Sequence, residues 1–236
     1  MNAKYPRGVL FDLDDTILSI NARVDQCWYK VSADFAAGHG LQVEQLIAAI
    51  NEVKDWYWND LERHRRGRLN LALARKEVVE LALAKLEFKD MQAAGELAKA
   101  YTHEIERNMK LFPGAVDTLK HLRKNDVMLA LITNGASDIQ RRKIERFELG
   151  PLFHCIIVES EFGTGKPDRR VFEHALGRLN VGHKDAWMVG DDLARDVAGA
   201  KQIGIHSIWV DWQGNGLPAS APVQPDRIIK SIAELI

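Results

Sequence analysis

Cysteine is scarce in this chain of 236 residues, and long hydrophobic runs are absent. The two cysteines, Cys27 and Cys155, are far apart and have no metal-type spacing, which excludes a disulfide framework and a cysteine-based metal site. No run approaches the roughly 18 apolar residues of a membrane span. Residues 1–15 also lack the long apolar region of a secretion signal. These absences predict a cytoplasmic protein that does not contact a membrane.

An excess of charge of either sign is also missing. The chain has 32 Lys and Arg residues against 33 Asp and Glu residues, for a formal net charge of −1. This balance gives no electrostatic reason to expect binding to nucleic acid or to an anionic membrane. The hydrophobic fraction of 46% is sufficient for a buried core. The length suits one large domain or two smaller ones.

The first half of the chain changes character after a short apolar run at 7–13, which predicts a strand. From about residue 20 to 108 no strand is evident, and apolar residues recur at helical spacing instead. Four helices are expected there, the first around 24–35 and three more at 43–64, 71–86 and 91–108.

From Leu111 onward, predicted helices and strands alternate. The expected helices are 115–125, 137–147, 169–179 and 196–204, and the expected strands are 127–133, 155–160, 186–190 and 206–210. Near-continuous apolar strands between helices indicate a parallel sheet that is buried on both faces, and the first strand is expected to join it. Residues 218–226, rich in Pro and Ala, predict a surface loop.

The predicted fold is therefore α/β, with a Rossmann-like parallel-sheet core and an inserted four-helix domain. The core comprises 1–18 and 109–236, and the insertion comprises 19–108. The two connections, near 17–21 and 107–113, are expected to act as hinges.

Polar side chains follow the apolar part of several predicted strands. Asp12 and Asp14 follow the first strand, Thr133 ends another, and Asp191 follows 186–190. In an open α/β sheet, ligands bind beyond the carboxyl ends of the strands. Because carboxylates repel one another, such a cluster favours a hard divalent cation such as Mg²⁺, which prefers oxygen ligands. Lys166, in the loop after 155–160, would add a second positive charge.

Four short motifs carry a family resemblance. FDLDDT, ITNG, the lysine of GKP and GDDLARD occur in this order, and together they resemble the signature motifs of the haloacid dehalogenase-like hydrolase superfamily. The helical insertion after the first motif resembles the α-helical (C1-type) cap of its phosphatase branch. The resemblance covers nearly the whole chain.

The resemblance implies distinct roles for the carboxylates. Asp12 would be the nucleophile that forms an aspartyl-phosphate. Asp14 would be the general acid and base, and its backbone carbonyl would bind the metal. Asp12, Asp14 and Asp191 would hold Mg²⁺, with Asp192 binding it directly or through water. Asp196 either supports the site or is a first-turn acid that is favoured by the helix dipole.

The phosphate-binding residues implied by the resemblance are Thr133, Asn134, Gly135 and Lys166. Thr133, the backbone amides that follow it and a nearby helix start suit a phosphate, although the same residue types also suit an ordinary helix N-cap. Lys166 would hold the nucleophile and the phosphate and would take part in catalysis with Thr133. Outside the four motifs, a lysine in a Gly-Lys-Pro loop would be interpreted as solvent-exposed.

Trp56, Tyr57, Trp58 and the arginines at 63–68 could contact substrate, but packing of the aromatics and a solvated arginine face are favoured.

The predicted activity is Mg²⁺-dependent hydrolysis of a small phosphomonoester, such as a nucleotide or a sugar phosphate, by a monomer or homodimer. Alternatives within the fold are a haloacid dehalogenase, a phosphonatase and a sugar phosphomutase. A non-catalytic phosphate-responsive binding module is an alternative from another class.

Overall fold

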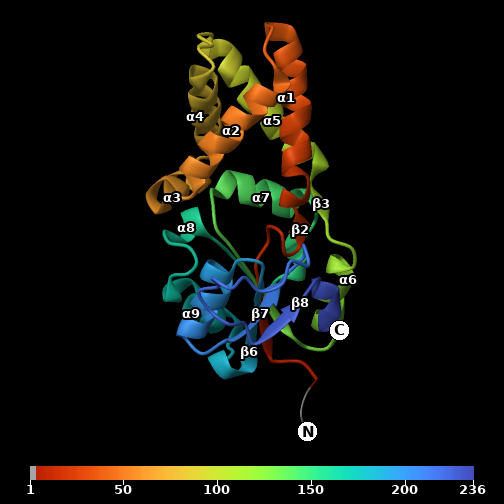
Figure 1. The fold of residues 1–236 in the computed structure, drawn as a ribbon. Helices are drawn as coiled ribbons and strands as arrows, with labels where there is room; N and C mark the ends of the chain where they lie inside the picture. The colour runs from red at the N-terminus through yellow and green to blue at the C-terminus, as the bar shows by residue number, and fades with distance from the viewer. Residues whose placement is uncertain (1–3) are drawn as a thin grey trace. The chain divides into compact units, whose positions relative to one another are not determined.

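A computed structural model describes residues 4–236, and the chain forms two compact units (Figure 1). Residues Ile20–Met109 form one, which we call the helical unit. The described chain up to Ser19 and from Lys110 to Ile236 forms the other, which we call the sheet unit. The boundaries observed here lie one residue from those that the sequence predicts.

The sheet unit is built on a six-stranded parallel sheet with the order β5-β4-β1-β6-β7-β8. Its strands are β1 (Gly8–Phe11), β4 (Met128–Thr133), β5 (Cys155–Val158), β6 (Ala186–Gly190), β7 (His206–Val210) and β8 (Arg227–Ile229). The four residues of β1 are buried, and Leu10 lies between Ala130 and Met188 of the neighbouring strands. The predicted α/β fold class is confirmed, while the short edge strand β8 was not predicted.

Helices join these strands and cover the sheet. They are α6 (Ala115–Lys124), α7 (Ser137–Arg146), α8 (Glu159–Phe162), α9 (Arg169–Leu179), α10 (Ala198–Gln202) and a single π-helical turn, η4 (Leu193–Val197). Short 3₁₀ turns are η1 (Asn21–Arg23), η2 (Gly150–Leu152), η3 (His183–Asp185) and η5 (Ile232–Leu235). A core cluster forms where α9 residues Phe172, Ala175 and Leu176 pack with Leu10 and Met188 of the sheet.

Several predicted boundaries in the sheet unit are wrong. The strand expected over 7–13 is Gly8–Phe11, and the helix expected to end at 204 ends at Gln202. The strand expected over 155–160 ends at Val158, because Glu159 begins the one-turn helix α8. The helix expected from Asp196 begins earlier, at Leu193, because the Asp192 side chain accepts hydrogen bonds from the backbone amides of Ala194 and Arg195 and caps the turn.

The helical unit contains α1 (Val24–His39), α2 (Val43–Trp58), α3 (Leu61–Leu69), α4 (Leu71–Lys85) and α5 (Met91–Asn108). Four of these are the long helices that the sequence predicts. The single helix expected over 43–64 is instead two helices, since Asp60 adopts an extended conformation and its carboxylate accepts the Arg63 backbone N–H at 2.8 Å. Asp60 is therefore an N-cap that starts α3.

The aromatic run at 56–58 has mixed environments within the helical unit. Tyr57 is buried, as the packing interpretation predicts, and a Cβ atom on Gly67 would lie 2.8 Å from the Tyr57 ring. Trp56, in contrast, is 50% exposed, and the Arg63 guanidinium lies 3.8 Å from its ring centroid. A close helix contact thus depends on Gly67.

The insertion leaves and re-enters the sheet unit at adjacent points. β2 (Leu18–Ser19) and β3 (Lys110–Leu111) form a two-stranded antiparallel sheet in which Ser19 pairs with Lys110. The Phe112 backbone N–H also donates to the Ile17 carbonyl at 2.9 Å. Both predicted connections, near 17–21 and 107–113, contain these paired residues.

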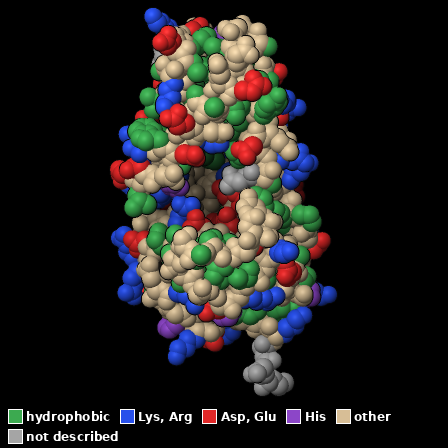
Figure 2. Space-filling model, in the orientation of Figure 1, with side chains coloured by type: hydrophobic (Ala, Val, Ile, Leu, Met, Phe, Trp, Pro, Cys, Tyr) green, Lys and Arg blue, Asp and Glu red, His purple; other side chains and the backbone are tan. Residues whose placement is uncertain are grey.

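Acidic and basic side chains are interspersed on the face shown in Figure 2, in keeping with the net charge of −1. Among the described residues, no helix combines the length and the apolar character needed to span a membrane.

Leu46→Ala should lower the free energy of unfolding by about 2–5 kcal/mol, because Leu46 is fully buried in the core of the helical unit. Leu61→Ala is the matched control, since Leu61 is 89% exposed in the same unit, and it should change stability by less than about 0.5 kcal/mol. Urea unfolding measures both, and equal losses would contradict this core assignment.

Candidate active site

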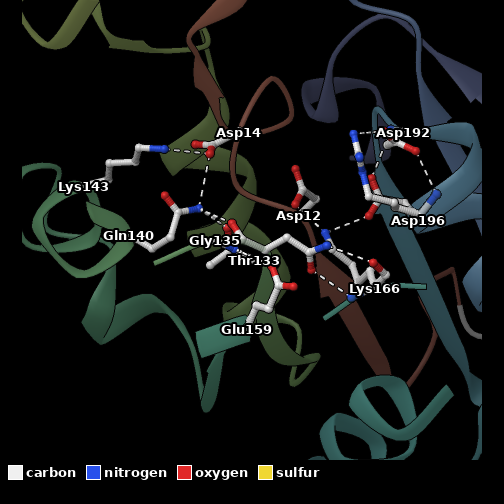
Figure 3. A network of polar contacts seen from close by, with 12 residues as sticks. Asp12, Asp14, Thr133, Gly135, Gln140, Lys143, Glu159, Lys166, Asp192 and Asp196 are labelled. Carbon is white, nitrogen blue, oxygen red and sulfur yellow. Dashed lines mark hydrogen bonds and ion pairs between the residues drawn. The ribbon is translucent and has the colours of Figure 1, made fainter. Parts of the chain in front are cut away.

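The carboxyl ends of the central strands bring the predicted site residues together (Figure 3). Asp12 directly follows β1, and its backbone N–H donates to the Val189 carbonyl of β6 at 2.9 Å. Thr133 is the last residue of β4, and Asp191 follows β6. Because these strands are neighbours in a parallel sheet, residues that are far apart in the sequence meet at one edge.

Lys166 is the buried cation of the site. It is 3% exposed, and its Nζ forms ion pairs with the carboxylates of Asp12 and, at 2.7 Å, Asp196. The loop that carries it is fixed by the side chain of Asn134, whose Nδ2 donates to the Lys166 carbonyl and whose Oδ1 accepts the Lys166 backbone N–H, both at 2.8 Å. Lys166 is therefore not the exposed loop lysine of the alternative interpretation.

The Thr133–Gly135 loop packs tightly against the loop before Lys166. A Cβ atom on Gly165 would lie 2.6 Å from Asn134 Oδ1 and 2.7 Å from Glu159 Cδ. The Gly135 backbone N–H donates to Glu159 Oε2 at 2.8 Å. The structure thus gives the Gly135 amide a protein partner, in place of the phosphate contact that the resemblance implies.

Three carboxylates form a compact oxygen cluster. One oxygen atom from each of Asp12, Asp191 and Asp196 lies within 4.8 Å of the others, and the Asp191 carbonyl accepts the Trp209 indole N–H at 2.7 Å. Asp196 is buried, and its carboxylate also accepts the Asp192 backbone N–H at 3.0 Å. Of the two sequence interpretations of Asp196, its placement favours a supporting role in the site.

Asp192 is directed differently from Asp191. Its Oδ1 accepts the backbone N–H groups of Ala194 at 2.9 Å and Arg195 at 2.7 Å, and its carboxylate forms an ion pair with the Arg195 guanidinium. Asp192 does not belong to the three-carboxylate cluster found among the described residues. The Asp192 carboxylate therefore caps η4 in this structure.

Burial and mutual repulsion shift the ionisation of the cluster. Burial raises the pKa of Asp12 to about 7, against the opposing charge of Lys166, and the carboxylates of Asp196 and Asp14 add to the rise. Burial also raises the pKa of Asp191 and Asp196. For Lys166, burial lowers the pKa, but Asp12 and Asp196 outweigh that effect and the net pKa is raised.

Asp14 lies beside a second cation. Lys143 Nζ is 2.6 Å from Asp14 Oδ2, and Gln140 Nε2 donates to the same oxygen at 3.2 Å. Gln140 also donates to the Thr133 hydroxyl oxygen. All of these contacts lie within the sheet unit, with Lys143 and Gln140 on α7.

A family model described as haloacid dehalogenase-like hydrolase matches residues 6–204. The chain belongs to this family. The match spans both units, and the sequence resemblance is thereby confirmed.

Named members of the hydrolase family resemble the chain over different lengths. A phosphoserine phosphatase of Thermus thermophilus is 37% identical over 145 residues, which are 61% of this chain and 57% of that protein. The match therefore spans less than two thirds of that relative. A ribulose-1,5-bisphosphate 5-phosphatase of Halopiger xanaduensis is 31% identical, over 86% of this chain and 84% of its own.

The hydrolase fold is also seen in a solved structure. The HAD-hydrolase YfnB from Bacillus subtilis, bound to magnesium in that crystal, has a TM-score of 0.74 and 22% sequence identity, and the match covers 98% of this chain and 97% of that one. This likeness supports the fold.

Sequence reasoning missed three polar residues of this hydrolase site, namely Gln140, Lys143 and Glu159. The signal for the first two was their spacing of three positions in a predicted helix, on the same side as Ile144. Glu159 lay in a predicted strand, and only the turn into α8 gives it its contact with Gly135.

Gly190→Ala should destabilise the hydrolase by about 1–3 kcal/mol, because a Cβ atom there would lie 2.2 Å from Asp196 Oδ2. Gly177→Ala is the control, since apart from its chain neighbours and the nearby backbone of α9 no atom lies within 4 Å of its Cβ position, and it should stabilise by about 0.5–1 kcal/mol. Thermal unfolding measures both variants, and a neutral Gly190→Ala would refute the close approach.

Proposed function

We propose that this chain hydrolyses small phosphomonoesters with Mg²⁺, through a phospho-aspartyl intermediate on Asp12. The observation that carries the proposal is the pairing of the buried Asp12 carboxylate with Lys166, next to Asp191 and Asp196 and two residues before Asp14. The activity class, a phosphoric monoester hydrolase, agrees with the names of the phosphatase relatives.

Asp12 supplies the nucleophilic oxygen. In the first half-reaction its carboxylate attacks phosphorus, the Asp12 oxygen–phosphorus bond forms, and the bond from phosphorus to the leaving oxygen breaks with its electron pair on that oxygen. Lys166 holds Asp12 in place and offsets negative charge as the phosphoryl group approaches. Asp196 fixes Lys166 from the other side.

Asp14 acts as general acid in the first half-reaction and as general base in the second. It protonates the leaving oxygen as the ester bond breaks, and the resulting carboxylate then takes a proton from the water that attacks the phospho-aspartate. That attack releases inorganic phosphate and restores Asp12. A haloacid dehalogenase would need neither this second acid nor a metal, so Asp14 and Asp191 favour the phosphatase over that alternative.

Thr133 is the proposed phosphate-binding hydroxyl. It ends β4 at the same sheet edge as Asp12, and the residue is 2% exposed. The Asn134 side chain is fully engaged with the Lys166 backbone, so it supports the lysine loop.

The acidic cluster fits a divalent cation. The three carboxylates offer only oxygen donors, and Lys166 forms ion pairs with two of them, Asp12 and Asp196. Burial, together with repulsion from neighbouring carboxylates, raises the pKa values of Asp12, Asp191 and Asp196, and a bound cation would offset that repulsion. Asp12 and Asp191 would hold Mg²⁺, together with the Asp14 carbonyl that the resemblance implies. When bound, the metal neutralises charge between nucleophile and phosphate.

We also propose that the helical unit is the α-helical cap of this enzyme and selects its substrate. The unit is inserted between β2 and β3, as the resemblance implies for a cap. The named relatives act on different phosphorylated small molecules, an amino acid phosphate in one and a sugar bisphosphate in another. The substrate class is accordingly a small phosphorylated metabolite.

Asp12→Asn should lower kcat for p-nitrophenyl phosphate more than about 1,000-fold, because an amide cannot form the phospho-aspartyl bond. Asp138→Asn, on the exposed side of α7, should retain wild-type activity. Phosphate release and circular dichroism are measured together. A folded Asp12→Asn variant with ordinary turnover would assign the nucleophile elsewhere.

Mg²⁺ should raise the thermal stability of the wild-type protein, because it binds the folded carboxylate cluster. At 100 times Kd, such binding adds about 2.7 kcal/mol. Asp191→Asn should reduce the effect and require more Mg²⁺ for half-maximal activity, whereas Asp185→Asn should match wild type. Thermal unfolding with Mg²⁺ and with EDTA tests this, and identical melting curves would argue against the metal site.

A further inference from the structure

Helix α7 directs two polar side chains at the proposed acid and at the phosphate-binding hydroxyl. Lys143 lies 2.6 Å from Asp14 Oδ2, and Gln140 contacts Asp14 Oδ2, the Thr133 hydroxyl and the Asn134 carbonyl (Figure 3). Neither residue belongs to the four sequence motifs. Both residues are at least 90% buried, whereas Lys and Gln residues are mostly exposed in folded proteins.

The burial of Lys143 is selective along the helix. Its side chain is 10% exposed, while that of the adjacent Arg142 is 63% exposed and pairs with Asp138 one turn earlier. Placing an ammonium in a largely buried position is costly unless a carboxylate compensates it. The contact with Asp14 Oδ2 provides that compensation, so the position of Lys143 and that of the Asp14 carboxylate are mutually fixed.

The contacts of Gln140 determine which way its amide points. Asp14 Oδ2 and the Asn134 carbonyl oxygen, at 3.2 Å and 3.1 Å, are acceptors when Asp14 is ionised, so the group facing them must be the NH₂ donor. The Thr133 hydroxyl oxygen is a third acceptor for the same NH₂ group, so the two N–H hydrogens are shared among three acceptors. The hydrogen of the Thr133 hydroxyl is thereby left to donate to another acceptor.

The second oxygen of Asp14 is in a different situation. Oδ1 is buried, and no hydrogen-bond partner for it is found in the described part of the chain. Lys143 and Gln140 therefore hold the carboxyl group through Oδ2 alone, which leaves Oδ1 as the oxygen for proton transfer.

We propose that Gln140 and Lys143 are positioning residues of the phosphatase reaction: together they fix Asp14 through Oδ2, and Gln140 orients the Thr133 hydroxyl as a donor to phosphate. This inference rests on the proposed function. In the first half-reaction the proton leaves Asp14 Oδ1 for the departing ester oxygen, which takes the electron pair of the broken bond. In the second, Oδ1 takes a proton from the attacking water, while Lys143 stays on Oδ2.

The test uses Lys143→Met in the full chain, with a series of aryl phosphates of rising leaving-group basicity. Because kcat/KM covers the steps up to the first phosphoryl transfer, it reports the need for proton donation to the leaving oxygen. Because Lys143→Met removes the contact that aligns Asp14, it should lower kcat/KM by about 10- to 100-fold for the most basic leaving group. The loss should be much smaller for p-nitrophenyl phosphate, so the dependence on leaving-group basicity becomes steeper.

Two variants separate this from a general loss of structure. Lys143→Arg keeps the cation and should restore most of the activity on basic leaving groups. Arg142→Met removes the neighbouring exposed cation and should leave the dependence unchanged. The role of Lys143 would be overturned if Lys143→Met lowered kcat/KM equally for all leaving groups. It would also be overturned if Lys143→Met behaved like Arg142→Met.

Gln140→Met tests the Thr133 contact separately. Without its donor the hydroxyl is no longer oriented, and the inhibition constant of inorganic phosphate should rise about 2- to 10-fold. Gln202→Met, at an exposed position of α10, is the control. Unchanged phosphate inhibition in Gln140→Met would overturn this part of the proposal. If folded wild type with Mg²⁺ releases no phosphate, the proposed function fails and this inference fails with it, whereas the outcomes above overturn this inference alone.

Discussion

The buried ion pairs of Lys166 with Asp12 and Asp196 are the interaction on which this site depends. A charge removed from water must find its opposite nearby, and removal of one partner leaves the other uncompensated. Several local features make these two ion pairs possible. Gly190 has no Cβ where Asp196 approaches, and Asn134 fixes the backbone of the lysine loop. The site therefore depends on close contacts between several segments of the chain, and no single motif supplies all of them.

Parallel topology explains how the sequence can supply such a site from separate segments. β1 lies between β4 and β6, so the residues after these three strands share one edge of the sheet. An insertion of about ninety residues does not disturb this arrangement, because β2 and β3 pair where the chain leaves and returns. Substrate selection and bond chemistry can then be carried by different parts of the chain, as the proposed cap and the sheet unit illustrate.

The sequence predicted those features that depend on local patterns. Apolar runs located most of the sheet, and the polar residues after them identified Asp12, Thr133 and Asp191. The break before α3 and the start of η4 escaped prediction, because each depends on an aspartate that caps a helix where the hydrophobic pattern continues. The contact of Lys143 with Asp14 joins positions 129 residues apart, and no spacing rule in one sequence reveals such a pair.

The different environments of Asp12 and Asp14 explain how two neighbouring carboxylates could perform different chemistry. Two positions apart on an extended chain, they would project to the same side and be equivalent. In the folded protein Asp12 shares a buried lysine with Asp196 and lies among other carboxylates, whereas Asp14 is held by residues of α7. When two carboxyl groups have different local environments, one can act as a nucleophile and the other as a proton donor. The proposed difference in role between Asp12 and Asp14 thus depends on residues far away in the sequence, on the loop after α8 and on α7.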